Sequence, residues 1–386
     1  MSALSSQKIG QTHIQERALA ILLPVLNLAA ALLLSALILL WLGKDPIAAL
    51  ALLADGAFGS PTAIGFTLYY ATSLTFTGLA VAIAFHGGLF NIGADGQAYI
   101  GGLGVGLMCL ALDGWPWWAA EPVTLLMGAA FGALWAAIPG ALQAYRGSHI
   151  VITTIMFNFI ASALMVHMLA NVIIEPNAMS PETREFSPSV WLPTLDRLVA
   201  LFGGKIPKSP LNISALLALL AALFVWLLVW RTRWGHELRT VGANPAAARY
   251  AGIDPKRTIV VAMALSGALA GLLGLNELQG VQHRITLNFP GGAGFAGIAV
   301  ALMGRGHPAG ILLAALLFGA LTQGGAELAF EDQTISPDLV VVIQGIIILF
   351  TGALEGLFRP AAARTLARLL PRVKVDAAGP AGGAPV

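Results

Sequence analysis

Long apolar runs recur along the whole chain, and short polar gaps separate them. Residues 18–42 and 61–85 are each 25 residues long and contain no charged side chain. A helix of about 20 apolar residues crosses a bilayer. Because backbone N–H and C=O groups in hydrocarbon must pair within their own segment, such runs have to be helical. We therefore predict an all-α fold, a polytopic membrane helical bundle of about ten transmembrane helices with broken Gly-rich segments.

The predicted spans follow one another at short intervals. The third and eighth are short and rich in glycine, so their bounds are the least sharp. The ten spans are Ala18–Leu42, Pro61–Phe85, Ala98–Leu112, Pro122–Tyr145, Ile150–Ile174, Leu211–Trp230, Thr258–Leu275, Pro290–Met303, Pro308–Ala326 and Leu339–Leu354.

Composition supports this fold class and narrows the chemistry. Charged residues make up 10% of the chain, against about 25% in soluble domains. Cys109 is the only cysteine, which excludes an intrachain disulfide and a cysteine metal cluster. The seven histidines show no ligand spacing. We predict no metal and no cofactor.

Basic residues lie mostly in every second gap between the spans, which predicts the orientation. The N-terminal segment 1–17, the gap after the fourth span, the loop 231–257 and the tail 358–386 together hold 14 of the 21 Lys and Arg residues. Because Lys and Arg stay on the cytoplasmic side, we predict that these regions, including both termini, are cytoplasmic and that the tail is largely disordered. The transmembrane domain is predicted at 18–357, with the loop at about 175–210 on the outer side.

Residues 87–97 form the most unusual stretch, since four glycines accompany three polar side chains directly after an apolar span. The three are Asn91, Asp95 and Gln97. Such glycine density breaks helices or lets backbones approach closely. Two interpretations remain open, namely a turn with a packing face or a broken helix beside a transport path. A second Gly-rich stretch covers residues 289–298.

Polar side chains inside the apolar spans offer further candidates for a transport path, because such residues are costly in a membrane. As a set they suit a polar, uncharged solute such as a sugar or a nucleoside. They are Asn158, His167, Asn276, Glu277, Gln279, Gln323 and Gln344. From both groups we predict that the solute path is lined or braced by Asn91, Asp95, Gln97, Asn158, Asn276 and Gln323.

The loop 231–257 is too long for a simple connection and contains a helix signal. Asn244 fits an N-cap, Pro245 the first turn, and Gly252 the end of a short helix. Such a helix is a natural contact for another protein, whereas a basic loop resting on anionic lipid is the plainer interpretation.

Three stretches together resemble a known family. Residues 241–253, Val-Gly-Ala-Asn-Pro-Ala-Ala-Ala-Arg-Tyr-Ala-Gly-Ile, resemble the cytoplasmic coupling loop of the permeases of bacterial ABC importers for simple sugars, nucleosides and branched-chain amino acids. Residues 90–97 resemble the Asn-Ile-Gly-acid-Gly-Gln motif of these permeases, with Asp95 where Glu is the commoner acid. Residues 297–308 resemble a third, Gly-rich block. The Asn-Ile-Gly block favours the nucleoside or simple-sugar branch.

The resemblance implies a transport subunit and not an enzyme. It implies as partners a cytoplasmic ABC ATPase, an extracytoplasmic solute-binding protein, and a second permease subunit, with a heterodimer preferred to a homodimer. Membrane lipid is expected, nucleic acid is not, and a bacterial inner membrane is the expected location. The chain has no Gly-x-x-x-x-Gly-Lys-[Ser/Thr] motif, so ATP would bind another chain. The residues that would contact the ATPase are Gly242, Asn244, Pro245, Ala247, Ala248, Tyr250 and Gly252.

A secondary carrier driven by an ion gradient is the alternative. Such a carrier needs an acidic side chain within the membrane, and only Asp95 and Glu277 could serve.

Overall fold

The computed structural model describes residues 29–41, 43–176 and 179–331, with Leu26 and six positions between 341 and 349. Helices dominate this part of the chain, which contains no β-strand and one isolated β-bridge, between Thr194 and Asn212. The predicted termini 1–17 and 358–386, most of the predicted tenth span Leu339–Leu354, and Gln344 lie outside the described residues.

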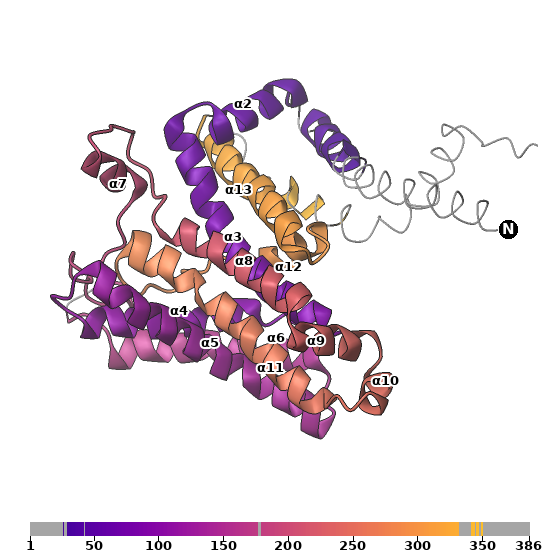
Figure 1. The fold of residues 1–386 in the computed structure, drawn as a ribbon. Coiled ribbons are helices and arrows are strands. Elements are labelled where there is room, and N and C mark those ends of the chain that lie inside the picture. The colour runs from indigo at the N-terminus through magenta and orange to yellow at the C-terminus, as the bar shows by residue number, and fades with distance from the viewer. Residues whose placement is uncertain are drawn as a thin grey trace, which may run out of the picture.

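The helices follow one another through short connections (Figure 1). After a first helix, Ala29–Trp41, the elements are α2 (Pro46–Phe58), α3 (Pro61–His86), α4 (Ala94–Ala111), α5 (Trp117–Arg146), α6 (Ile150–His167), the π-helical η1 (Met168–Val172), α7 (Leu195–Leu201), α8 (Ser214–Arg231), α9 (Arg233–Ala243), α10 (Pro245–Tyr250), α11 (Pro255–Gly271), the π-helical η2 (Leu275–Gln282), α12 (Ala293–Met303) and α13 (Pro308–Glu331).

Six of the described helices are long and apolar enough to cross a membrane, and a seventh results if Ala29–Trp41 and α2 form one bent span. The six are Pro61–His86, Trp117–Arg146, Ile150–Val172, Ser214–Arg231, Pro255–Gln282 and Pro308–Glu331. The two predicted Gly-rich spans correspond to α4 and to α12, which has only 11 residues. The all-α membrane bundle is thus confirmed. Helix α2 was not predicted, and α4 begins four residues before the predicted start at Ala98.

Four helices begin in the same way, with a capping side chain followed by proline. In each, a side-chain oxygen accepts a hydrogen bond from a backbone N–H of the first turn, and proline follows at the first helical position. Proline lacks an N–H that would be unpaired there anyway. The four pairs are Asp45–Pro46, Ser60–Pro61, Asn244–Pro245 and Asp254–Pro255.

Glycines bring α4, α5 and α11 into backbone contact. Gly128 and Gly132 on α5, and Gly267 and Gly271 on α11, are each four residues apart and therefore share a helix face. A Cβ atom on Gly132 or Gly267 would clash with the backbone of the other helix, and one on Gly271 or Gly101 would do the same. Small residues permit such approach where lipid supplies no hydrophobic driving force.

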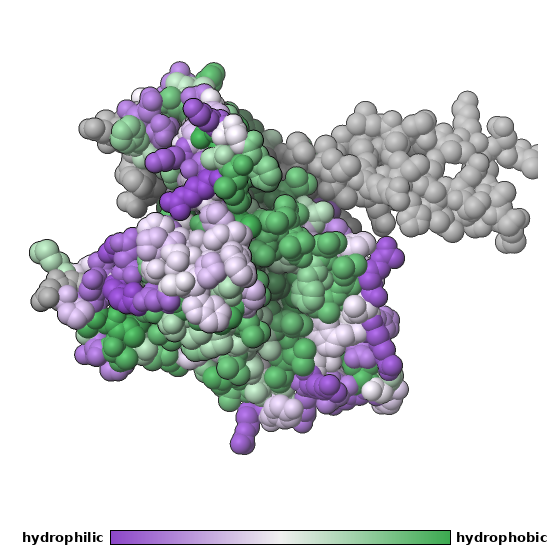
Figure 2. All heavy atoms as spheres, turned by 60° about the vertical axis from the view of Figure 1, so that its left-hand side comes forward, coloured by the Kyte–Doolittle hydropathy of each residue, from purple (hydrophilic) through white to green (hydrophobic). Residues whose placement is uncertain are grey.

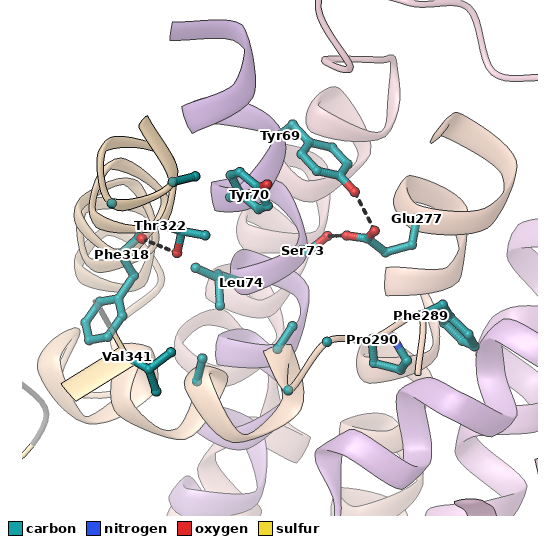
Figure 3. Close-up of a pocket in the computed structure, with 16 residues that line it drawn as sticks. Tyr69, Tyr70, Ser73, Leu74, Glu277, Phe289, Pro290, Phe318, Thr322 and Val341 are labelled. Carbon is teal, nitrogen blue, oxygen red and sulfur yellow. Dashed lines mark hydrogen bonds between the residues drawn. The ribbon is translucent and has the colours of Figure 1, made fainter. Parts of the chain in front are cut away.

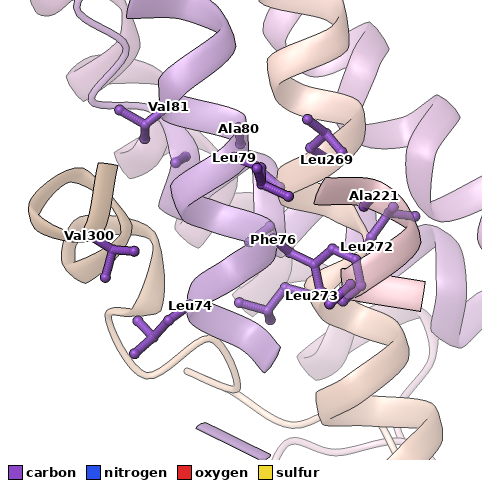
Figure 4. Close-up of a cluster of buried hydrophobic side chains, with 14 of the residues drawn as sticks. Leu74, Phe76, Leu79, Ala80, Val81, Ala221, Leu269, Leu272, Leu273 and Val300 are labelled. Carbon is purple, nitrogen blue, oxygen red and sulfur yellow. The ribbon is translucent and has the colours of Figure 1, made fainter. Parts of the chain in front are cut away.

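Helix α3 forms the centre of the bundle. It packs against α8, α11, α12 and α13, and most of its length is buried. Phe76 and Leu79 of α3 lie with Leu269, Leu273 and Val300 in one apolar cluster (Figure 4). On the face that Figure 2 shows, hydrophobic residues gather over the middle and hydrophilic ones toward the margins.

The bundle has two polar ends. The continuous helix α11–η2, Pro255–Gln282, has 28 residues and therefore spans about 42 Å at 1.5 Å per residue. One end adjoins α10, and we call this side the α10 face; the other adjoins the loop that carries α7, and we call it the α7 face (Figure 1).

Replacing Gly267 with Leu should destabilise the bundle, because the side chain would meet the backbone of α5. Overpacking of this kind costs about 1–3 kcal/mol, although leucine favours a helix more than glycine does. Ala163→Leu is the matched control, since Ala163 is exposed on α6. Thermal unfolding in detergent should show a lower Tm for the first variant only. Equal Tm values for both variants would show that the contact is not tight.

Candidate functional site

The amides of Asn91 and Gln97 form a closed pair at the start of α4. Nδ2 of Asn91 donates to Oε1 of Gln97 at 3.0 Å, and Nε2 of Gln97 donates back to Oδ1 of Asn91 at 3.2 Å. Oδ1 of Asn91 also accepts from the N–H of Gly93 at 2.9 Å. Both side chains are 1% exposed. The two amides therefore satisfy one another in the interior.

This pair ties three helices together. Nδ2 of Asn91 also donates to Oγ of Ser266 on α11 at 2.8 Å, and the Ser266 hydroxyl donates to the carbonyl of Ala80 on α3 at 2.6 Å. We call Asn91, Gln97 and Ser266 the amide brace. Hydrogen bonds between buried polar groups in a membrane fix helices against one another.

Asn158 of α6 fastens the same break from the other side. Its Oδ1 accepts from the N–H of Gly96 at 2.9 Å, and its Nδ2 donates to the carbonyl of Ile92 at 3.0 Å. Asp95, half-buried in the first turn of α4, accepts from the N–H of Gly294 at the start of α12 at 3.2 Å. The stretch 91–97 thus joins α3, α4, α6, α11 and α12.

A cavity of about 400 Å³ opens between α3, η2, α12 and α13. Glu277 of η2 points toward Tyr69 and Ser73, which lie one turn apart on α3 (Figure 3). The hydroxyl of Tyr69 donates to Oε2 of Glu277, and that of Ser73 donates to Oε1 at 2.8 Å. Apart from Glu277, the described residues that line the cavity have uncharged side chains.

Asn276 lies beside Glu277 and holds the wall of the cavity. Its Nδ2 donates to Oγ of Ser73 at 2.7 Å and to the carbonyl of Tyr69 at 3.1 Å. Its Oδ1 accepts from Asn212 at 3.0 Å and from Ser214 at 2.8 Å. Every hydrogen-bonding group of this buried amide is thus used.

The structure places the predicted path residues in two groups. Asn91, Asp95, Gln97 and Asn158 surround the break before α4, and none of them lines the cavity. Asn276 lies directly behind the cavity, and Gln323 is half-buried beside Thr322, which lines it.

Sequence reasoning missed the cavity itself. Glu277 was recognisable as an acid at the end of an apolar span, and such residues mark functional sites. Tyr69 and Ser73 carried no comparable signal. Their role depends on the packing of η2 against α3, which no local pattern reports.

The loop 231–257 folds into two helices at the α10 face. Oδ1 of Asn244 accepts from the N–H groups of Ala246 and Ala247 at 2.9 and 3.1 Å, so it caps α10 as predicted. Gly252 follows with a φ of 78°, a conformation that glycine adopts without strain. Ala248 is buried against the bundle, whereas Tyr250 is 95% exposed.

A glycine contact joins this segment to the stretch before the amide brace. Gly242 of α9 lies so close to Gly88 that a Cβ atom on Gly88 would come within 3.1 Å of Gly242, and one on Gly242 would clash with the carbonyl oxygen of His86. Only two residues separate Gly88 from Asn91. Helix α9 thus contacts the chain directly before the amide brace.

At the α7 face, the loop 182–192 is fastened onto the end of η2. The carbonyl of Gln279 accepts from the N–H of Leu192 at 3.2 Å, and Nε2 of Gln279 donates to the carbonyl of Val190 at 2.9 Å. His283 stacks on Trp191 with 3.8 Å between ring centroids. Burial lowers the pKa of His283.

Comparison with known proteins agrees with this geometry. Residues 63–352 match the family described as branched-chain amino acid transport system / permease component. The chain belongs to this family. No solved structure matches it.

Three relatives are similar to this permease over most of their length. The guanosine ABC transporter permease protein of Bacillus subtilis is 36% identical over 86% of this chain and 93% of its own. A nucleoside ABC transporter permease protein of Lactococcus lactis is 35% identical over 86% of this chain and 90% of its own. The glucose ABC transporter permease protein of Haloferax volcanii is 34% identical over 85% and 86%.

Family membership makes the chain a multi-pass membrane permease, a transport component and not an enzyme. Permeases of ABC transporters work with an ATPase and a solute-binding protein. Catalysis is therefore not expected of the clusters described above.

The reciprocal pairing of the brace amides predicts non-additive mutations. Asn91→Ala removes both partners of the buried Gln97 amide, which costs about 1–3 kcal/mol in the free energy of unfolding. Gln97→Ala should cost less, because Asn91 keeps its hydrogen bonds with Ser266 and Gly93. The double variant should lose less than the sum of the two single losses. Unfolding of the purified permease measures all three. Strict additivity would show that the two amides act independently.

Proposed function

We propose that this permease imports a nucleoside, as the membrane-spanning subunit of an ATP-driven transporter, with a simple sugar as the alternative solute. Two relatives carry guanosine or nucleoside in their names and one carries glucose. The chief structural support is the cavity at Glu277, where a carboxylate and several hydroxyls lie within an otherwise apolar wall. A polar solute with hydroxyl groups suits this lining.

We propose that an ABC ATPase docks on α10. Support comes from the exposure of Asn244, Pro245, Ala247 and Tyr250, whose side chains have no cover from the rest of the bundle. Ala248 of α10 and Gly242 of α9 face inward and would hold α10 against the bundle. Gly252 lies just beyond the end of α10. ATP-driven motion would then pass from α10 through α9 and the Gly242–Gly88 contact to the amide brace.

We propose that the solute-binding protein docks on the α7 face and that a second permease completes the path. A heterodimer is the preferred pair, because Bacillus subtilis has two different proteins named as guanosine ABC transporter permeases. The α10 face is proposed to be cytoplasmic, as its basic residues require, with both termini on the same side. The membrane is then a bacterial inner membrane.

In this arrangement the predicted path residues have different proposed roles. We propose that Asn91, Gln97 and Asn158 brace the path, since their amides are used by protein partners. Asp95 would hold α12 at its edge. Asn276 would fix the wall beside Glu277, and Gln323 would contribute from α13.

An ion-coupled secondary carrier remains the second candidate function because Glu277 lies in a membrane helix next to a cavity. An acid in this position can serve as a cation or proton site in carriers. The two candidates differ in whether an ATPase is needed.

Replacing Ala247 with Asp should prevent the ATPase from docking. The new carboxylate would be stranded in a contact, which costs about 2–5 kcal/mol. Co-purification from membranes should lose the ATPase, while the variant permease inserts at its normal level. Ala200→Asp is the control, because Ala200 is an exposed alanine on α7 at the opposite face, and this variant should retain the ATPase. Retention by both variants would refute docking on α10.

Cysteine labelling should place the two faces on opposite sides of the membrane. Phe202, 92% exposed just after α7, and Tyr250, 95% exposed on α10, are each replaced by cysteine in a chain where Cys109 is alanine. A membrane-impermeant maleimide should label position 202 in intact spheroplasts and position 250 only after lysis. Labelling of both positions from outside would contradict the proposed orientation.

A further inference from the structure

Glu277 is a buried acidic side chain that has no ion-pair partner in the described part of the bundle. It is 9% exposed. Charged groups buried in a membrane protein are costly and are kept where they have a task. Its carboxyl group accepts hydrogen bonds from the hydroxyls of Tyr69 and Ser73, and the side chain of Gln282 also lies close to it.

The carboxylate has unused capacity to accept hydrogen bonds. Two carboxylate oxygens offer about four acceptor positions, and each oxygen of Glu277 receives one protein hydroxyl. Because Glu277 also lines the cavity, a solute there can reach the remaining positions. The amide brace differs in this respect, since its groups are paired with one another away from the cavity.

The rest of the cavity suits a flat, largely apolar group. Tyr70 lines it from α3 and Pro290 from the loop before α12 (Figure 3), whereas Phe289 is 5% exposed and its ring packs against Tyr99. Aromatic side chains contact flat rings favourably. The volume of about 400 Å³ falls in the usual range for small-molecule sites.

We propose that Glu277 recognises the two neighbouring ribose hydroxyls of a nucleoside, each donating a hydrogen bond to the carboxylate, while the base lies along Tyr70. An acidic side chain that accepts from ribose hydroxyls is a recurrent solution in nucleotide-binding proteins. This inference rests on the proposed function, and it makes Glu277 a specificity-determining residue of the path. Ser73 and Tyr69 hold the carboxylate in position.

The test compares solutes that differ only in these hydroxyls. The complete transporter, co-purified with its partners and reconstituted with ATP, is assayed for uptake of guanosine, 2′-deoxyguanosine, 3′-deoxyguanosine and 2′,3′-dideoxyguanosine. Loss of hydrogen bonds to a charged acceptor should reduce uptake of the dideoxy compound at least about tenfold relative to guanosine.

Three variants assign that preference to the carboxylate. Glu277→Met has similar size and no strong acceptor, so its preference for guanosine should vanish. Glu277→Gln keeps one acceptor without the charge and should show an intermediate preference, since neutral hydrogen bonds are about half as strong. Glu175→Gln, at a half-buried acid outside the cavity, should keep the wild-type preference. If the Met variant fails to assemble, the Gln variant and the wild-type series decide the question.

Each result separates the inference from the function on which it rests. If the wild-type transporter takes up neither guanosine nor its deoxy analogues, the proposed nucleoside function fails. If it takes up all four nucleosides equally, or if the Met or Gln variant keeps the full preference, the function stands and the role of Glu277 is refuted. Suppose instead that a Glu277 variant keeps the preference for guanosine but loses a dependence on a proton or sodium gradient that the wild-type transporter shows. Glu277 would then be an ion site, and the proposal would also be refuted.

Discussion

The backbone contact between α5 and α11 is the constraint on which the rest of the bundle depends. Lipid tails are as apolar as the side chains of membrane helices, so no hydrophobic effect drives these helices together. Close packing and hydrogen bonds stabilise their association instead. Glycines at 128, 132, 267 and 271 provide the close packing. Helix α11 is thereby fixed in the interior, where one of its side chains joins the amide brace and its extension η2 carries Glu277 to the cavity.

Two kinds of buried polar group follow from this arrangement, and their hydrogen bonds distinguish them. Asn91 and Gln97 close on one another, so they hold helices and have little left to offer a solute. Glu277 uses only part of its acceptor capacity and faces the cavity. A single helix, α11–η2, connects both groups, and the loop 182–192 secures its far end. Both groups thus lie along one helix that runs from the α10 face to the α7 face.

Much of the fold was readable in the sequence because hydrophobic length and capping are local properties. The long spans and the short helix at Asn244–Pro245 were predicted for reasons that the structure repeats. Helix α2 was missed, although Asp45 and Pro46 formed a capping pair of the same kind. The cavity could not be predicted, since Tyr69 and Glu277 are 208 positions apart and meet only through the packing of η2 on α3.

Measuring which energy source drives transport is the most direct test of the proposed function. The permease and its co-purified partners are reconstituted into proteoliposomes, and guanosine uptake is measured with ATP on the side of α10 and with all ion gradients collapsed. The account predicts uptake that requires ATP and the ATPase and is indifferent to ionophores. Uptake by the permease without an ATPase, driven by an imposed proton or sodium gradient, would contradict it.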